Sequence, residues 1–177
     1  MFRTFAEGLA AGRALTFGHR GARAYAPMNT IPSFELAHEM GAHGIEFDVR
    51  RSKDGVLVLL HDATIDGTSN GNGNVADLTF AELRELDFGG WLDAKYAGTQ
   101  IPTLDELFEA VGNKFLMNVE IKCERLASEG IEQQVAETIA RHGLAGRILI
   151  SSFNPLVVKR SAKARSEEHT SELQSLR

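Results

Sequence analysis

The sequence predicts an α/β fold of the (β/α)8-barrel type, on the strength of three observations. Apolar extended runs alternate with amphipathic helical segments along the 177 residues, an order typical of parallel strands joined by helical crossovers. Hydrophobic residues make up 43% and charged residues 24% of the chain, which fits a soluble globular protein. Polar residues gather where several predicted strands end, as at the carboxyl-end face of a barrel. An open doubly wound sheet is the competing architecture.

The predicted elements follow this alternation except for one long interruption. The stretch at about 62–100 is rich in Gly, Asn, Asp and Thr and is interpreted as an insertion with one short helix. Asn29 or Thr30 can cap the first helix, and Thr103 with Glu106 forms a capping-box pattern. The expected elements are a strand at 14–18, a helix at 29–41, a strand at 43–55, an extended run at 56–62, a helix at 103–112, a strand at 114–122, a helix at 129–144, a strand at 146–153 and a helix beginning at 154.

Composition excludes several classes of protein. A single cysteine, Cys123, excludes an intramolecular disulfide framework and a cysteine-rich zinc module. A net charge of −5 argues against nucleic-acid binding over a broad surface. We expect no transmembrane segment, since no stretch approaches the roughly 20 apolar residues required. Charged residues at Glu7 and Arg13 also disfavour an export signal, so a cytoplasmic location is expected.

Carboxylates at two strand ends favour a bound cation. Glu46 and Asp48 are two residues apart on a predicted strand, so their side chains point to one face, and Glu120 lies near the end of another strand. Converging carboxylates repel one another, and three oxygen donors favour Ca²⁺ or Mg²⁺ over zinc. The alternative is ordinary ion pairing of these acids with Arg50, Arg51 or Lys122.

Two histidines and two cations also follow apolar runs. His19 and His61 could divide the roles of base and acid, and Arg20 and Lys122 suit phosphate oxygens. Together these groups indicate chemistry at a phosphodiester, although a histidine taken singly is more often structural. Structural roles are assigned to the remaining histidines, which are His38, His43, His142 and His169.

Five motifs, in one order, resemble the glycerophosphodiester phosphodiesterase family over residues 15 to 160, approximately. They are HRGARAYAPMNT, GIEFDVRRSKDGVLVLLHDATIDGTSNGNG, IPTLDELFEAV, VEIK and SSFNP. The resemblance implies a TIM barrel of the phospholipase-C-like phosphodiesterase type. It also implies hydrolysis of small-molecule glycerophosphodiesters to sn-glycerol 3-phosphate and an alcohol, with a divalent cation, Ca²⁺ or Mg²⁺.

The resemblance further implies a role for each of seven residues. A base would help the substrate's glycerol 2-hydroxyl attack phosphorus, the other histidine would protonate the departing alcohol, and water would then open the cyclic phosphate. Which histidine takes which role is left open. The implied roles are acid and base for His19 and His61, metal ligands for Glu46, Asp48 and Glu120, and phosphate binding for Arg20 and Lys122.

The sequence departs from the family pattern at two places. Met28 stands where the family's PENT motif has a glutamate, which is predicted to weaken the site without abolishing it. The later strands of the family barrel have no counterpart, so the domain at 1–165 is predicted to be a C-terminally truncated barrel that contains the N-terminal half to two-thirds. Residues 166–177 are interpreted as a non-native tail, with an amphipathic final helix as the alternative.

Two alternative functions and one mode of association are also considered. A lysophospholipase D-type activity would use the same site but would need room for an acyl chain. The chain could instead be an inactive fragment. The edges of an open barrel invite self-association, since their strands lack partners.

Overall fold

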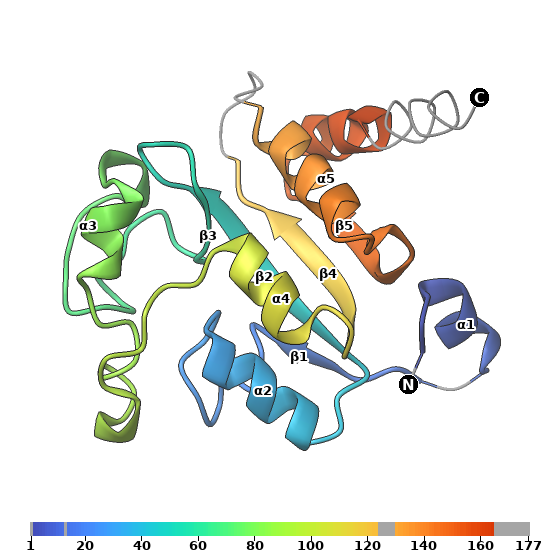
Figure 1. The fold of residues 1–177 in the computed structure, drawn as a ribbon, viewed down its shortest axis with the longest axis horizontal. Coiled ribbons are helices and arrows are strands. Elements are labelled where there is room, and N and C mark those ends of the chain that lie inside the picture. Colours follow the sequence, from blue (N-terminus) through green and yellow to red (C-terminus); the bar gives the residue numbers. More distant parts are fainter. Residues whose placement is uncertain (1, 13, 124–129, 165–177) are drawn as a thin grey trace.

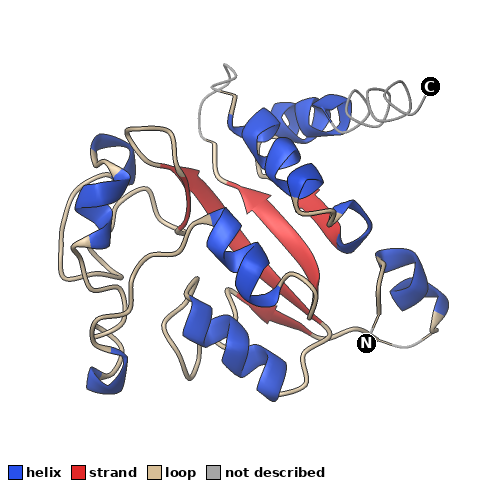
Figure 2. Cartoon of the chain, viewed as in Figure 1, coloured by secondary structure: helices blue, strands red, loops and turns tan. Residues whose placement is uncertain are grey.

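The computed structural model describes residues 2–12, 14–123 and 130–164 as an α/β arrangement (Figures 1 and 2). Residues 155–164 are also helical. The tail predicted at 166–177 lies outside the described residues. In chain order the elements are α1 (Phe5–Ala10), β1 (Phe17–His19), α2 (Ile31–Glu39), β2 (Gly44–Arg51), β3 (Leu57–Leu59), the 3₁₀ turn η1 (Val75–Asp77), α3 (Phe80–Arg84), the 3₁₀ turn η2 (Ala94–Tyr96), α4 (Leu104–Val111), β4 (Leu116–Ile121), α5 (Ile131–Arg141), the 3₁₀ turn η3 (Ala145–Arg147) and β5 (Ile148–Ser151).

Four strands form a parallel sheet in the order β1-β2-β4-β5. Helices α2, α4 and α5 lie on one side of this sheet (Figure 1) and share one apolar core with it. Parallel strands in sequence order with helices on the outside form part of a (β/α)8 barrel. The predicted α/β class and partial barrel are therefore confirmed.

Strand β3 differs from the others because it pairs antiparallel with β2. Val49 of β2 is opposite Leu59 on one side and Ile121 of β4 on the other, so β3 lies on the same edge of β2 as β1. The connection is too short for a parallel return. It turns at Gly55, whose φ of 89° is readily adopted by glycine.

The N-terminal elements were predicted least well. Strand β1 begins three residues later than the predicted strand at 14–18, and helix α1 was not expected at all. α1 has six residues, too few for a clear helical period, and Thr4 caps it by accepting a hydrogen bond from the Glu7 backbone. Phe5 stacks on Phe17 with ring centroids 6.1 Å apart, so tertiary packing holds the helix against β1.

Helix caps are partly as predicted. The capping box of Thr103 and Glu106 is present at the start of α4. Thr30 is the cap residue of α2, whereas Asn29 has a φ of 58° and makes contacts elsewhere. Asn29 is therefore not a helix cap, and its role is taken up below.

The insertion packs around a second, smaller apolar core, to which Val58 of β3 contributes. Helix α3 lies within the short helix expected there and begins with a second capping box. No helix among the described residues is long and apolar enough to cross a membrane. The members of the second core are Val58, Leu60, Ile65, Val75, Leu83, Phe88 and Ile101.

Candidate active site

The strand register arranges the polar strand residues in two adjacent layers. Side chains alternate between the faces of a sheet, so residues paired across parallel strands share a face. The apolar residues of β2 and β4 face the helices, and the polar residues between them face inward. The inward layers consist of His19, Glu46 and Asn118, and of Asp48, Glu120 and Ser151.

Three carboxylates meet on this inner face. Glu46, Asp48 and Glu120 each offer an oxygen within 4.8 Å of the others. The Asp48 side chain is fully buried, so its charge is removed from water. Burial, and next the charge of Asp48, raise the pKa of Glu46 to about 7. The Glu46 carboxylate is therefore poorly hydrated and also lies close to like charge.

Two cations partly neutralise the three acids. Lys122 Nζ lies 3.0 Å from Asp48 Oδ1 and 2.6 Å from Glu120 Oε1. Arg20 Nε lies 3.2 Å from Asp48 Oδ2, and the Arg20 backbone N–H donates to Glu46 Oε2 at 3.2 Å. Ion pairing of the acids with Lys122, which was the alternative to a metal site, is therefore present. Asp48 Oδ1 is buried, and its contact with Lys122 is an ion pair without a hydrogen bond of normal geometry among the described residues.

His19 lies at the edge of the acid cluster. Its Nε2 is 3.5 Å from Glu46 Oε2, and half of its side chain is exposed. Burial and then the charges of Arg20 and Arg23 lower the pKa of His19. The imidazole is therefore more readily neutral than a free histidine, which suits a group that accepts a proton.

His61 reaches the site from the loop after β3. Its Nδ1 lies 2.7 Å from Asp62 Oδ1, and its carbonyl accepts two hydrogen bonds from Arg50, at 2.9 Å from Nε and 2.8 Å from the terminal nitrogen. A cavity of about 580 Å³ is lined by His61 together with Glu120 and Lys122. This volume is in the range of small-molecule sites.

The seven residues predicted from the sequence thus converge, although His61 joins the group through a shared cavity. The sequence reasoning missed two buried partners, Asn29 and Arg50. Asn29 hydrogen-bonds Asp48, and Arg50 holds the His61 carbonyl. Their positions inside two of the five motifs were the available signal, because both contacts join separate segments of the chain.

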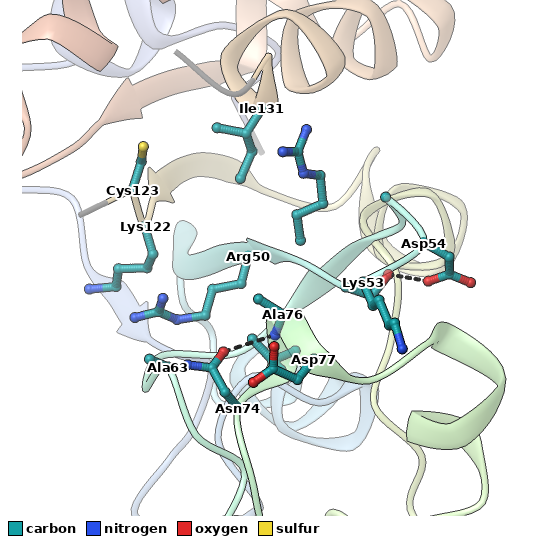
Figure 3. A pocket seen from close by; sticks show the side chains of 14 residues that line it. Arg50, Lys53, Asp54, Ala63, Asn74, Ala76, Asp77, Lys122, Cys123 and Ile131 are labelled. Carbon is teal, nitrogen blue, oxygen red and sulfur yellow. Dashed lines mark hydrogen bonds between the residues drawn. The ribbon is translucent and has the colours of Figure 1, made fainter. Parts of the chain in front are cut away.

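A second cavity, of about 860 Å³, adjoins the site. Lys122, Cys123 and Arg50 line both cavities, and Arg50 and Lys122 extend toward the same side in Figure 3. Cys123 also packs against the main core. The two cavities therefore share lining residues at the ends of β2 and β4.

The described histidines that were assigned structural roles do make structural contacts. His43 Nδ1 lies 2.8 Å from Thr16 Oγ1, and His142 Nε2 lies 2.8 Å from Asp105 Oδ1. His38 packs edge-on against Phe115. His169 lies outside the described residues.

Four parallel strands in chain order, with helices outside and charged groups inside, place this chain in the (β/α)8-barrel class. A family model described as "Glycerophosphoryl diester phosphodiesterase family" matches residues 19–176. The chain belongs to this family, as the five motifs had predicted.

Similar proteins carry the same family name. A glycerophosphodiester phosphodiesterase of Caldanaerobacter subterraneus subsp. tengcongensis is 46% identical over 143 residues, which are 80% of this chain and 59% of that protein. A glycerophosphodiester phosphodiesterase structure from Agrobacterium tumefaciens aligns with a TM-score of 0.78 and 32% identity, covering 88% of this chain and 64% of the other.

A second solved structure has a ligand in its description. It is an Oleispira antarctica phosphodiesterase in complex with the product sn-glycerol-3-phosphate, with a TM-score of 0.73 and 33% identity. The alignment covers 88% of this chain and 63% of that one. The present chain thus spans about 60% of the length of these relatives.

Proposed function

We propose that the inner face of this sheet hydrolyses glycerophosphodiesters to sn-glycerol 3-phosphate and an alcohol. The observation that carries the proposal is the convergence of three carboxylates, two cations and two histidines on one face of a chain that belongs to this family. The phosphodiesterase from Oleispira antarctica, described with sn-glycerol-3-phosphate as its product, supports the choice of product.

A divalent cation, Ca²⁺ or Mg²⁺, would be held by Glu46, Asp48 and Glu120. The fit rests on two observations. Asp48 Oδ1 is buried beside Lys122 and has no hydrogen bond of normal geometry among the described residues, and the pKa of Glu46 is raised by burial and by the charge of Asp48. Hard oxygen ligands without sulfur suit either ion. When bound, such an ion would stabilise negative charge on the diester oxygens. Lys122 would then share Asp48 and Glu120 with the ion.

Arg20 and Lys122 are the proposed phosphate-binding groups. Both already lie at the acid cluster, and their side chains are only 14% and 11% exposed. A diester placed in the cavity beside Lys122 and His61 would exchange water for the Lys122 ammonium, and Arg20 would act from the acid cluster next to it. Charge that develops on the non-bridging oxygens would then meet fixed positive groups in a site of restricted hydration.

The two histidines are proposed to take different roles. His19, with its lowered pKa, is neutral at neutral pH and would accept the proton of the glycerol 2-hydroxyl. His61 Nδ1 lies at Asp62. In its protonated form, His61 would give the Nε2 proton to the departing alcohol when the 2-oxygen bonds to phosphorus, and would later take a proton from the water that opens the cyclic phosphate, while His19 returns its proton to the 2-oxygen.

The test is an assay with two substrates, run with Mg²⁺ or Ca²⁺. Release of sn-glycerol 3-phosphate from glycerophosphocholine is expected, without choline release from lysophosphatidylcholine. The opposite preference would indicate the lysophospholipase D-type activity. A folded protein that binds the cation but hydrolyses neither substrate would indicate the inactive fragment.

Self-association is proposed through the open edges of the sheet. Among the described residues β1 pairs only with β2 and β5 only with β4, and Leu149 on β5 is 49% exposed. Unpaired parallel edges favour association. Sedimentation over a range of concentrations tests this proposal, and a monomer throughout would contradict it. The cytoplasmic location stays a prediction.

A further inference from the structure

Asn29 has an unusual backbone conformation for a buried residue. Among the described residues only Arg20 and Asn29 have positive φ without being glycine, at 57° and 58°. The Asn29 backbone N–H donates to the Arg20 carbonyl at 3.1 Å, so the two residues support one another. Conformations of this kind are costly for most residues and concentrate at functional sites.

The Asn29 side chain is directed at a single partner, Asp48. Its Nδ2 donates to Asp48 Oδ2 at 2.9 Å, and its Oδ1 accepts from the Asp48 backbone N–H at 3.3 Å. Asn29 is 2% exposed and Asp48 is fully buried. The Asn29 carboxamide therefore hydrogen-bonds both the carboxylate and the backbone N–H of Asp48.

These two hydrogen bonds determine which oxygen of the Asp48 carboxylate faces the acid cluster. Oδ2 is engaged by Asn29 and lies beside Arg20. Oδ1 lacks a hydrogen bond within the described part of the chain and lies 3.0 Å from Lys122 Nζ, which also contacts Glu120. The terminal torsion of an aspartate is broad and readily rotates. Asn29 restricts that rotation.

We propose that Asn29 is a positioning residue that presents Asp48 Oδ1 to a divalent cation, an inference that rests on the metal site of the proposed function. The residue type fits the task, because asparagine tolerates positive φ better than most residues. An aspartate here would place a carboxylate against Asp48, and a glycine would keep the backbone but lack the amide.

The experiment measures cation binding by thermal shift and calorimetry in the full chain. Asn29→Gly removes the amide while keeping a backbone suited to positive φ, and Asn29→Ser serves if the glycine variant does not fold. We expect the concentration of Mg²⁺ or Ca²⁺ for half-saturation to rise by about 10- to 100-fold, the usual effect of losing the partner of a metal ligand. The unfolding temperature without cation should also fall, because buried Asp48 loses two hydrogen bonds, so the half-saturation concentration from calorimetry is the readout that decides the role.

Asn70→Gly is the matched control, because it removes an asparagine side chain that accepts from the Asp87 backbone, outside the site. Its half-saturation should equal that of the wild type. Unchanged half-saturation in a folded Asn29 variant overturns the role of Asn29 while leaving the metal site intact. A wild-type protein that shows no cation response overturns both the proposed metal site and this role.

Discussion

The two faces of the parallel sheet are made from the same strands yet have opposite physical characters. Residues of β2 and β4 that face the helices are apolar and almost completely buried. The residues between them face inward and are acids whose like charges repel one another. They are Glu46, Asp48 and Glu120. Residues that pack the core and residues of the candidate site thus alternate along each strand. Substitutions on the two faces should therefore have separable effects.

The largest effect is expected on stability, from a substitution on the outer face of the sheet, which packs against the helices. Phe47 is fully buried and packs edge-on against Phe34 and Phe108, with centroids 6.0 and 6.5 Å away. Phe47→Ala should lower the free energy of unfolding by about 3–5 kcal/mol, measured by urea denaturation. A loss below about 1 kcal/mol would show that the outer face is not the main core.

The inner face should give its largest effect in activity. His61→Ala should lower kcat by about 100- to 10,000-fold, because a positioned acid and base is removed, with little change in urea stability since the side chain is 33% exposed. The control is His142→Ala, whose ring contacts Asp105 away from the site. Equal effects of the two substitutions on kcat would contradict the assignment.

A smaller effect is expected from pH in cation-free buffer. The pKa of Glu46 is raised from 4.5 to about 7, so the folded protein retains a proton in this window that the unfolded chain releases. Stability should therefore fall as pH rises from 4.5 toward 7, by the linkage between proton binding and folding.

Glu46→Gln isolates this contribution, because the glutamine does not titrate. His19 acts in the opposite sense, since its lowered pKa costs stability as pH falls below 6.5, but it is present in both proteins. The difference in unfolding temperature between variant and wild type should grow with rising pH. A difference that does not vary with pH would contradict the raised pKa.

The smallest effect is expected at Met28, where the side-chain sulfur accepts from Arg20 at 3.6 Å. Met28→Glu would replace a weak acceptor with a carboxylate and should raise kcat/KM by about two- to fivefold, as expected for a partly exposed ion pair worth up to about 1 kcal/mol. Met28→Gln is the uncharged control. No gain from the glutamate over the glutamine would contradict the idea that Met28 weakens the site.

The sequence alone predicted the α/β class and the capping box at Thr103, because these depend on local periodicity and local hydrogen bonds. The partial barrel was implied by the family resemblance and by the missing later strands. The sequence also predicted the inward carboxylates, since strand alternation places Glu46 and Asp48 on one face. The antiparallel pairing of β3 was not foreseen.

Residues whose partners are distant in sequence were harder to assign. Asn29 precedes Thr30 and a helix, so it resembles a cap, and neither its positive φ nor its contact with Asp48 nineteen residues away can be read from the chain. Arg50 was weighed only as a partner for the acids, because its bonds to a main-chain carbonyl leave no mark on the sequence.

The central claim is that the inner face performs diester hydrolysis while the outer face only supports it. Phosphorus NMR of glycerophosphocholine with the purified chain and Mg²⁺ or Ca²⁺ tests this claim most directly. The account predicts that the diester signal is replaced by that of sn-glycerol 3-phosphate with the wild type and persists with His61→Ala. A persistent diester signal with folded wild-type protein and saturating cation would contradict the claim.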